Sequence, residues 1–177
     1  MTVNFDPIRT AVDSGRVQAA LGLSRAHLHA LVTTSYNYGL GAVMPRPVGL
    51  LGGSMVWDVR ELEAAVPAIQ EARQNVKRNA PRIERDPVTL ASLAARREDY
   101  QGIPHVLGLI DADMIAAHFG VGPRYPSEWA ERKKLLPPPV GALGTRRVWA
   151  VEDVKAHEER ILKHLARRRE LAERRQP

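Results

Sequence analysis

Apolar and polar residues follow a pattern that occurs twice along this chain. Residues 45–62 return as residues 137–154 at a constant offset of 92, without a gap, and nine of the 18 paired positions are identical. Chance pairing would give about one identity, so self-similarity of this kind indicates an internal duplication. We therefore expect two small domains.

Each copy has the pattern of a short hairpin followed by a helix. Val48-Gly49-x-Leu51 and Val56-Trp57 alternate around a glycine-containing turn, as the two strands of a small ribbon do. The preceding Pro-x-Pro keeps the chain out of a helix, and a helical period restarts after the tryptophan. The second copy repeats this order through Trp149, and both tips, 53–55 and 145–147, are expected to be exposed.

The residues before each ribbon complete the pattern. Residues 17–24 and 115–122 share a small apolar helix end, a glycine suited to a left-handed C-terminal cap, an apolar residue and the start of another helix. The order of all parts resembles the excisionase-type (AlpA-type) branch of the MerR-like winged helix-turn-helix proteins, over about 50 to 60 residues in each half. The resemblance implies a mainly α fold with small β wings: two winged helix-turn-helix domains joined by a partly helical linker, with a C-terminal helix.

We divide the chain on this basis into four parts. They are a first domain, a partly helical linker, a second domain and a basic C-terminal helix, at residues 1–66, 67–107, 108–157 and 158–177. Cap and proline signals predict a helix opening at Asp6-Pro7 and another from Asp86-Pro87 to about Asp99. Ala68 to Asn79 is expected to continue the closing helix past a proline kink.

In this family the second helix of the motif enters the DNA major groove. The resemblance therefore implies that Arg25, His27 and His29 contact bases or phosphates, while Ser24 binds a phosphate at the helix N-terminus. Arg46 and Ser54 belong to the first wing and complete the candidate surface of this copy. The first copy also carries six extra residues, which we place within 33–41. This loop either contacts DNA or a partner, or is a connector that packs its tyrosines.

The second copy departs from the pattern at its recognition helix. Pro126 fits only the first turn of a helix, so the helix is either delayed to Ser127, with Ser127 or Tyr125 near its start, or distorted, which argues against base reading here. Its basic residues can still hold phosphates, and a basic wing tip can reach phosphates or the minor groove. The candidate DNA contacts of this copy are Arg124, Tyr125, Ser127, Arg132, Lys133, Arg146 and Arg147.

Composition narrows the classes of function. A net charge of +6 and a pI near 10.1 favour a polyanionic partner. The absence of cysteine excludes disulfides, thiolate metal sites and a cysteine nucleophile. Without a long apolar run or a signal-peptide pattern, we expect a cytoplasmic protein that does not contact membranes. The histidines lack metal-site spacing and no catalytic constellation is visible, so we expect no enzyme, no cofactor and no metal.

These observations lead to two functional hypotheses. The first is sequence-specific binding of double-stranded DNA by tandem winged helices, as a transcription regulator, excision factor or centromere-type binder of a mobile element. The alternative is a protein-interaction or assembly module, as in phage packaging, with only non-specific DNA affinity. The basic C-terminal helix has three equally weighted uses: a homodimer contact, a phosphate-binding extension, or a solvated end.

Overall fold

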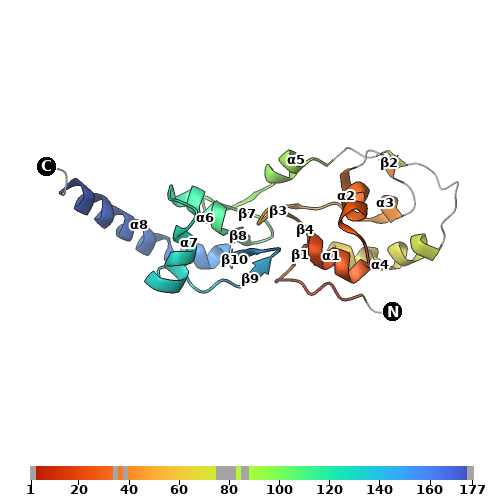
Figure 1. The fold of residues 1–177 in the computed structure, drawn as a ribbon, viewed down its shortest axis with the longest axis horizontal. Coiled ribbons are helices and arrows are strands. Elements are labelled where there is room, and N and C mark those ends of the chain that lie inside the picture. The colour runs from red at the N-terminus through yellow and green to blue at the C-terminus, as the bar shows by residue number, and fades with distance from the viewer. Residues whose placement is uncertain (1–2, 34–35, 38–39, 75–82, 85–87, 175–177) are drawn as a thin grey trace. The chain divides into compact units, whose positions relative to one another are not determined.

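The computed structural model describes residues 3–33, 36–37, 40–74, 83–84 and 88–174. The chain divides into two compact units, Met1–Arg97 and Glu98–Pro177, called here the first and the second unit. Both combine helices with small antiparallel sheets, and the second ends in a long helix (Figure 1). This confirms the coarse expectation of a mostly helical chain with small β elements. The boundary between the units lies inside the segment that we expected to be a linker.

The first unit is built on a three-stranded antiparallel sheet with the order β1-β4-β3. Its strands are β1 (Ala11–Asp13), β3 (Gly49–Leu51) and β4 (Ser54–Asp58). Its helices are α1 (Ser14–Leu21), α2 (Arg25–Thr33), α3 (Leu40–Val43), α4 (Val59–Gln74) and α5 (Leu90–Ala94). A second sheet pairs β2 (Tyr36–Asn37) with β5 (Ile83–Glu84).

The second unit repeats this topology in the sheet order β8-β10-β9. The strands are β8 (Leu109–Asp111), β9 (Gly141–Leu143) and β10 (Arg146–Ala150). The helices are α6 (Ala112–Phe119), α7 (Tyr125–Glu128), the π-helical turn η1 (Trp129–Lys133) and α8 (Val151–Glu173). A hairpin of β6 (Glu98–Tyr100) and β7 (Ile103–His105) precedes the repeated part.

The first helix of each unit starts and stops by the same chemistry. The carboxylates of Asp13 and Asp111 each accept a hydrogen bond from a backbone N–H of the first helical turn, at 2.8 Å in both units. At the other end, Gly22 and Gly120 adopt left-handed φ angles of 59° and 63°. An L-residue with a side chain adopts this conformation at a cost, so each glycine fixes where the next helix begins.

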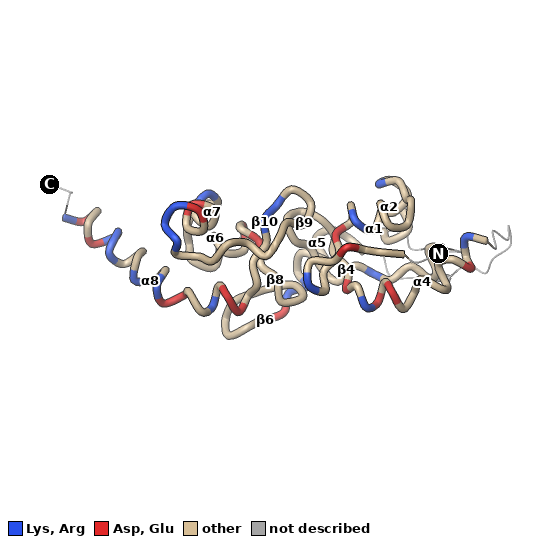
Figure 2. The backbone as a smooth tube through the Cα atoms, turned by 90° about the horizontal axis from the view of Figure 1, so that it is seen from below, with Lys and Arg blue, Asp and Glu red and all other residues tan. Residues whose placement is uncertain are grey.

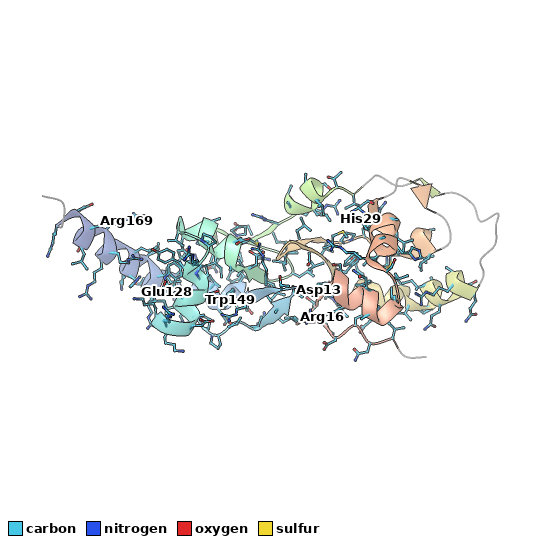
Figure 3. The ribbon with its side chains drawn as sticks, in the orientation of Figure 1. Asp13, Arg16, His29, Glu128, Trp149 and Arg169 are labelled. Carbon is cyan, nitrogen blue, oxygen red and sulfur yellow. The ribbon has the colours of Figure 1, made fainter. Side chains whose placement is uncertain are left out.

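A buried tryptophan in the central strand anchors each sheet. Trp57 lies opposite Val12 and Trp149 opposite Ile110, and both indoles are fully buried (Trp149 is labelled in Figure 3). Their Nε1–H groups donate to the carbonyl oxygens of Pro45 and Pro137, at 2.9 and 3.0 Å. The proline segment leading into each hairpin is thereby fastened to the sheet.

The prediction that a helix begins at Asp6-Pro7 is wrong. A tight turn at Arg9, with φ 55°, closes the Ile8 to Ala11 bridge and leads directly into β1. The second unit has the same turn at Leu107, with φ 52°. All three residues of β1 are buried and paired with β4, so this long-range pairing outweighs the local cap signal.

The helix predicted from Asp86 to Asp99 is shorter in the structure than expected. Only α5 forms, capped by Thr89, and the chain then enters β6 and a turn at Gln101-Gly102 whose φ angles are 52° and 88°. The predicted starting pair Asp86-Pro87 lies outside the described residues. By contrast, α4 continues through Pro67 to Gln74, as expected for the continuation of the closing helix. The last part of that predicted helix, residues 75–79, lies outside the described residues.

Replacing either anchoring tryptophan should destabilise its own unit. Trp57→Phe and Trp149→Phe each lose the hydrogen bond to proline as well as buried ring volume, for an expected loss of about 1 to 4 kcal/mol in unfolding free energy. Urea unfolding followed by circular dichroism measures this. Trp129→Phe is the matched control, because it removes the same ring volume without touching the hairpin anchor. Equal losses in all three variants would contradict the anchoring role.

Candidate nucleic-acid interface

The outer face of α2 carries the candidate residues of the first unit. Leu28 and Val32 are buried and hold the helix on the core. The remaining positions near its N-terminus are exposed: Ser24, Arg25, Ala26, His27, His29 and Ala30. The helix contains no Asp or Glu. The exposed part of α2 is therefore neutral or basic throughout.

The N-terminus of α2 is shaped by Ser24. Its Oγ accepts a hydrogen bond from the backbone N–H of His27 at 3.2 Å, which makes Ser24 the N-cap of α2. His29 lies one turn further on, where its Nδ1 is 3.4 Å from the Thr33 hydroxyl (Figure 3). The Thr33 hydroxyl donates to the His29 carbonyl at 2.8 Å, so this end of the face is ordered by local hydrogen bonds.

Arg46 and Ser54, the candidates from the first hairpin, occupy different environments. The half-buried Arg46 guanidinium donates to the carbonyl oxygen of Val32 at the end of α2. Arg46 thus fastens α2 to the proline segment by binding a carbonyl at the C-terminus of this helix. Ser54 begins β4 opposite Leu51, next to the Gly52-Gly53 turn, and is partly exposed. Ser54 therefore lies at the hairpin tip, whereas Arg46 lies at its base.

The second helix of the second unit has an unusual course. It begins at Tyr125, with Pro126 in its first turn, and passes into the π-helical turn η1 before Lys134 ends it with φ 53°. The start is therefore at Tyr125, one of the two residues expected near a delayed start, and the helix is also distorted by the π-helical turn. Proline at the first turn is tolerated because the N–H it lacks has no helical partner there.

Tyr125 is held by the C-terminal helix. The Arg168 guanidinium donates to the Tyr125 hydroxyl at 3.0 Å and lies 5.2 Å from the centre of its ring. On its other side the ring makes an edge contact with Trp129, at 5.9 Å between centroids. Sequence reasoning missed Arg168, because it lies 43 positions away along the chain within a run of arginines. A tyrosine clamped in this way positions α8 against α7.

The other candidates of the second helix form a mostly exposed, mixed surface. Arg124, Arg132 and Lys133 are exposed and Ser127 is half-buried, but Glu128 and Glu131 lie among them. Figure 2 shows basic stretches next to α7 and acidic and basic residues alternating along α8. The second helix of the second unit thus presents both signs of charge, whereas the exposed face of α2 in the first unit carries no negative charge.

The hairpin arginines of the second unit are both ion-paired. Arg146 pairs with Asp113 on α6, and Arg147 pairs with Glu131 on η1. The two arginine side chains are each 45% exposed and both carboxylates 54%, so solvent reaches all four groups. The hydrogen bond from Arg147 lowers the pKa of the Glu131 carboxyl. Sequence reasoning identified both arginines but missed both carboxylates, since neither is close to them in sequence.

His164 on α8 lies within this basic neighbourhood. Burial lowers its pKa first, and the nearby charges of Lys133 and Arg168 lower it further, while Glu128 acts in the opposite direction. The neutral imidazole is therefore favoured where α8 meets the second helix.

The C-terminal helix buries one side only near its start. Val151, Val154 and Ile161 are buried, whereas Leu162 and Leu171 are 51% and 48% exposed. Dimerisation, phosphate binding and a solvated end remain three predictions for this helix.

Comparisons with protein-family models, with curated proteins and with solved structures find no match for this chain. Within the described ranges, no helix combines the length and apolar character that crossing a bilayer requires. Among the same residues, no group of three or more His, Asp or Glu side chains is arranged to hold a metal ion.

Arg46→Ala should act on stability rather than directly on DNA. Loss of a charged donor to the Val32 carbonyl should lower the unfolding free energy by about 1 to 3 kcal/mol. Arg25→Ala is the matched control, since Arg25 is exposed and its removal should leave the urea midpoint within experimental error. An unchanged midpoint for Arg46→Ala would contradict its structural role.

The environment of His164 predicts acid sensitivity. A lowered pKa means that the unfolded chain binds the proton more readily, so stability should fall as pH drops from about 7 towards 5. His164→Gln removes this titration, and its unfolding free energy should decline less over the same interval. Parallel declines in wild type and variant, measured by urea unfolding at each pH, would rule His164 out as the cause.

Proposed function

We propose that this chain binds double-stranded DNA sequence-specifically, with α2 of the first unit as the recognition helix. The observation that carries the proposal is the exposed face of α2. It presents Arg25, His27 and His29 beside a serine-capped N-terminus and bears no carboxylate. Arginine can donate two hydrogen bonds to a guanine edge, and histidine donates to bases or phosphates.

The arrangement around α2 supports this role. A helix that enters a groove must be held rigidly from behind, and α2 is fixed by two buried residues, by the Gly22 turn before it and by Arg46 at its end. The hairpin β3–β4 follows in the order that winged helix-turn-helix proteins use, and the second unit repeats that order. On this proposal the chain is a tandem winged-helix protein, similar to the excisionase branch of the MerR-like proteins.

The second unit would then add affinity rather than sequence reading. Once α2 is bound, the tether raises the local concentration of the second unit at the neighbouring DNA. Arg124, Arg132 and Lys133 are exposed and suited to phosphates, which supply affinity without sequence information. The biological role we propose is that of a transcription regulator, excision factor or centromere-type binder of a mobile element.

A protein-interaction or assembly module is the second candidate. The mixed charges of Glu128, Glu131 and their basic neighbours favour it for the second unit, because such a surface suits another protein better than a polyanion. The exposed Leu162 and Leu171 of α8 offer a homodimer contact. Light scattering at several concentrations, with and without DNA, tests this: stable oligomers and weak, sequence-independent DNA binding would favour assembly.

Fluorescence-anisotropy binding separates the two functions. A duplex selected from a random pool and its scrambled version are each titrated across a salt series. The proposal expects a steep salt dependence and a preference for the selected duplex of about 10³ or more. Equal and weak binding of both duplexes would reject sequence recognition.

Arg25→Ala should relax this preference at one position of the site. Loss of a two-pronged arginine contact should cost about 1 to 3 kcal/mol on the selected duplex and much less on the scrambled one. Arg60→Ala is the matched control, because Arg60 is an exposed arginine of the same unit paired with Asp58 on β4. A preference for the selected duplex that is the same in both variants would exclude Arg25 as a base reader.

A further inference from the structure

The second helices of the two units differ in charge. Helix α2 contains no Asp or Glu, whereas the second helix of the other unit carries Glu128 in α7 and Glu131 in η1. The same scaffold therefore presents a surface that attracts phosphates in one unit and partly repels them in the other.

The hairpins of the two units also differ in charge, and here the second unit carries the additional positive charge. The tip of the first hairpin, Gly52 to Met55, is uncharged, whereas the second hairpin carries Arg146 and Arg147 at the start of β10. Each of these arginines is paired with a carboxylate from a different helix of its own unit: Asp113 from α6 and Glu131 from η1. The positive charge of the second hairpin is therefore balanced, one for one, by groups beside it.

A contribution to folding stability is a weak explanation for these two ion pairs. All four side chains are about half exposed, and ion pairs in such positions contribute little to folding because solvent screens them. Their effect on a charged ligand is larger. A phosphate that approaches Arg146 or Arg147 must displace a carboxylate and then lie next to it, so both acids compete with and repel the DNA backbone.

We propose that Asp113 and Glu131 are specificity determinants that suppress non-specific DNA binding by the second unit. The inference rests on the proposed function of the first unit. With its hairpin arginines occupied, the second unit binds a duplex weakly on its own and engages only where α2 has already delivered the chain to its site. Specificity is the difference between the affinity for the target site and the affinity for other DNA. A repulsive element that lowers the affinity for other DNA therefore increases specificity.

The test removes the two negative charges without removing the arginines. Asp113→Asn/Glu131→Gln is compared with Glu63→Gln/Glu71→Gln, which makes the same change of net charge on exposed positions of α4. The first variant should bind the scrambled duplex roughly three- to tenfold more tightly than the control at low salt, because phosphates no longer compete with carboxylates. Binding to the selected duplex should change less, so the preference for it falls.

The gain must depend on the hairpin arginines. Adding Arg146→Ala/Arg147→Ala to the Asp113→Asn/Glu131→Gln variant should abolish the increase, as a double-mutant cycle would report for interacting groups. Thermal unfolding of every variant checks that the fold is retained; if Asp113→Asn disturbs α6, Glu131→Gln alone should still give part of the increase. Equal affinity of the carboxylate variant and the α4 control for the scrambled duplex would overturn the proposal.

Salt elution from a heparin column keeps this result separate from the proposed function. Heparin is a polyanion without base sequence, so later elution of the Asp113→Asn/Glu131→Gln variant than of the α4 control supports the role of the acids even if no duplex is preferred. Wild type that prefers no duplex would reject sequence recognition by α2. Identical elution of the two variants would reject the role of the acids, whatever α2 does.

Discussion

Each unit of this protein depends on one buried indole. The central strand of each three-stranded sheet carries a tryptophan whose ring lies in the core and whose N–H donates to a proline carbonyl 12 residues earlier. That single contact joins the sheet to the segment between the second helix and the hairpin. A buried indole N–H without an acceptor would be costly, so the proline segment is held where it can supply one.

The recurrence of this contact explains how the two units can diverge elsewhere. The capping aspartate, the left-handed glycine and the indole fix the backbone, and other positions are then free to change. His118 and Glu158 of the second unit occupy the positions of Ala20 and Val66 in the first. The apolar pair packs against the core, whereas the polar pair forms a 2.9 Å hydrogen bond, to which Lys155 adds a 2.5 Å ion pair. The hydrogen bond from Lys155, more than that from His118, lowers the pKa of the Glu158 carboxyl.

The same divergence reaches the candidate DNA surface. In the first unit the second helix is regular, presents basic and neutral side chains, and is fixed at its end by Arg46. In the second unit Pro126 lies in the first turn of the helix, a π-helical turn ends it, and Tyr125 is clamped by Arg168 from α8. A surface already bound to the unit's own C-terminal helix is less adaptable to bases. This is the physical reason for proposing that the first unit reads the sequence and that the second has a subsidiary role.

The sequence by itself determined the repeat and the signals that are local to it. The glycine caps at Gly22 and Gly120, the Ser24 and Asp111 caps and the hairpins around Trp57 and Trp149 each depend on residues within about one turn or one hairpin of each other. The general place of the candidate surface followed from the same signals.

Only the tertiary structure decided the features that depend on distant partners. Strand β1 exists because β4 offers it a hydrogen-bonding edge, so the Asp6-Pro7 signal predicted a helix that does not form. Arg46 binds the end of α2, and Arg146 and Arg147 meet Asp113 and Glu131, through contacts that span 14 to 33 positions of chain. Such pairings follow from the folded backbone, and residue type alone does not specify them.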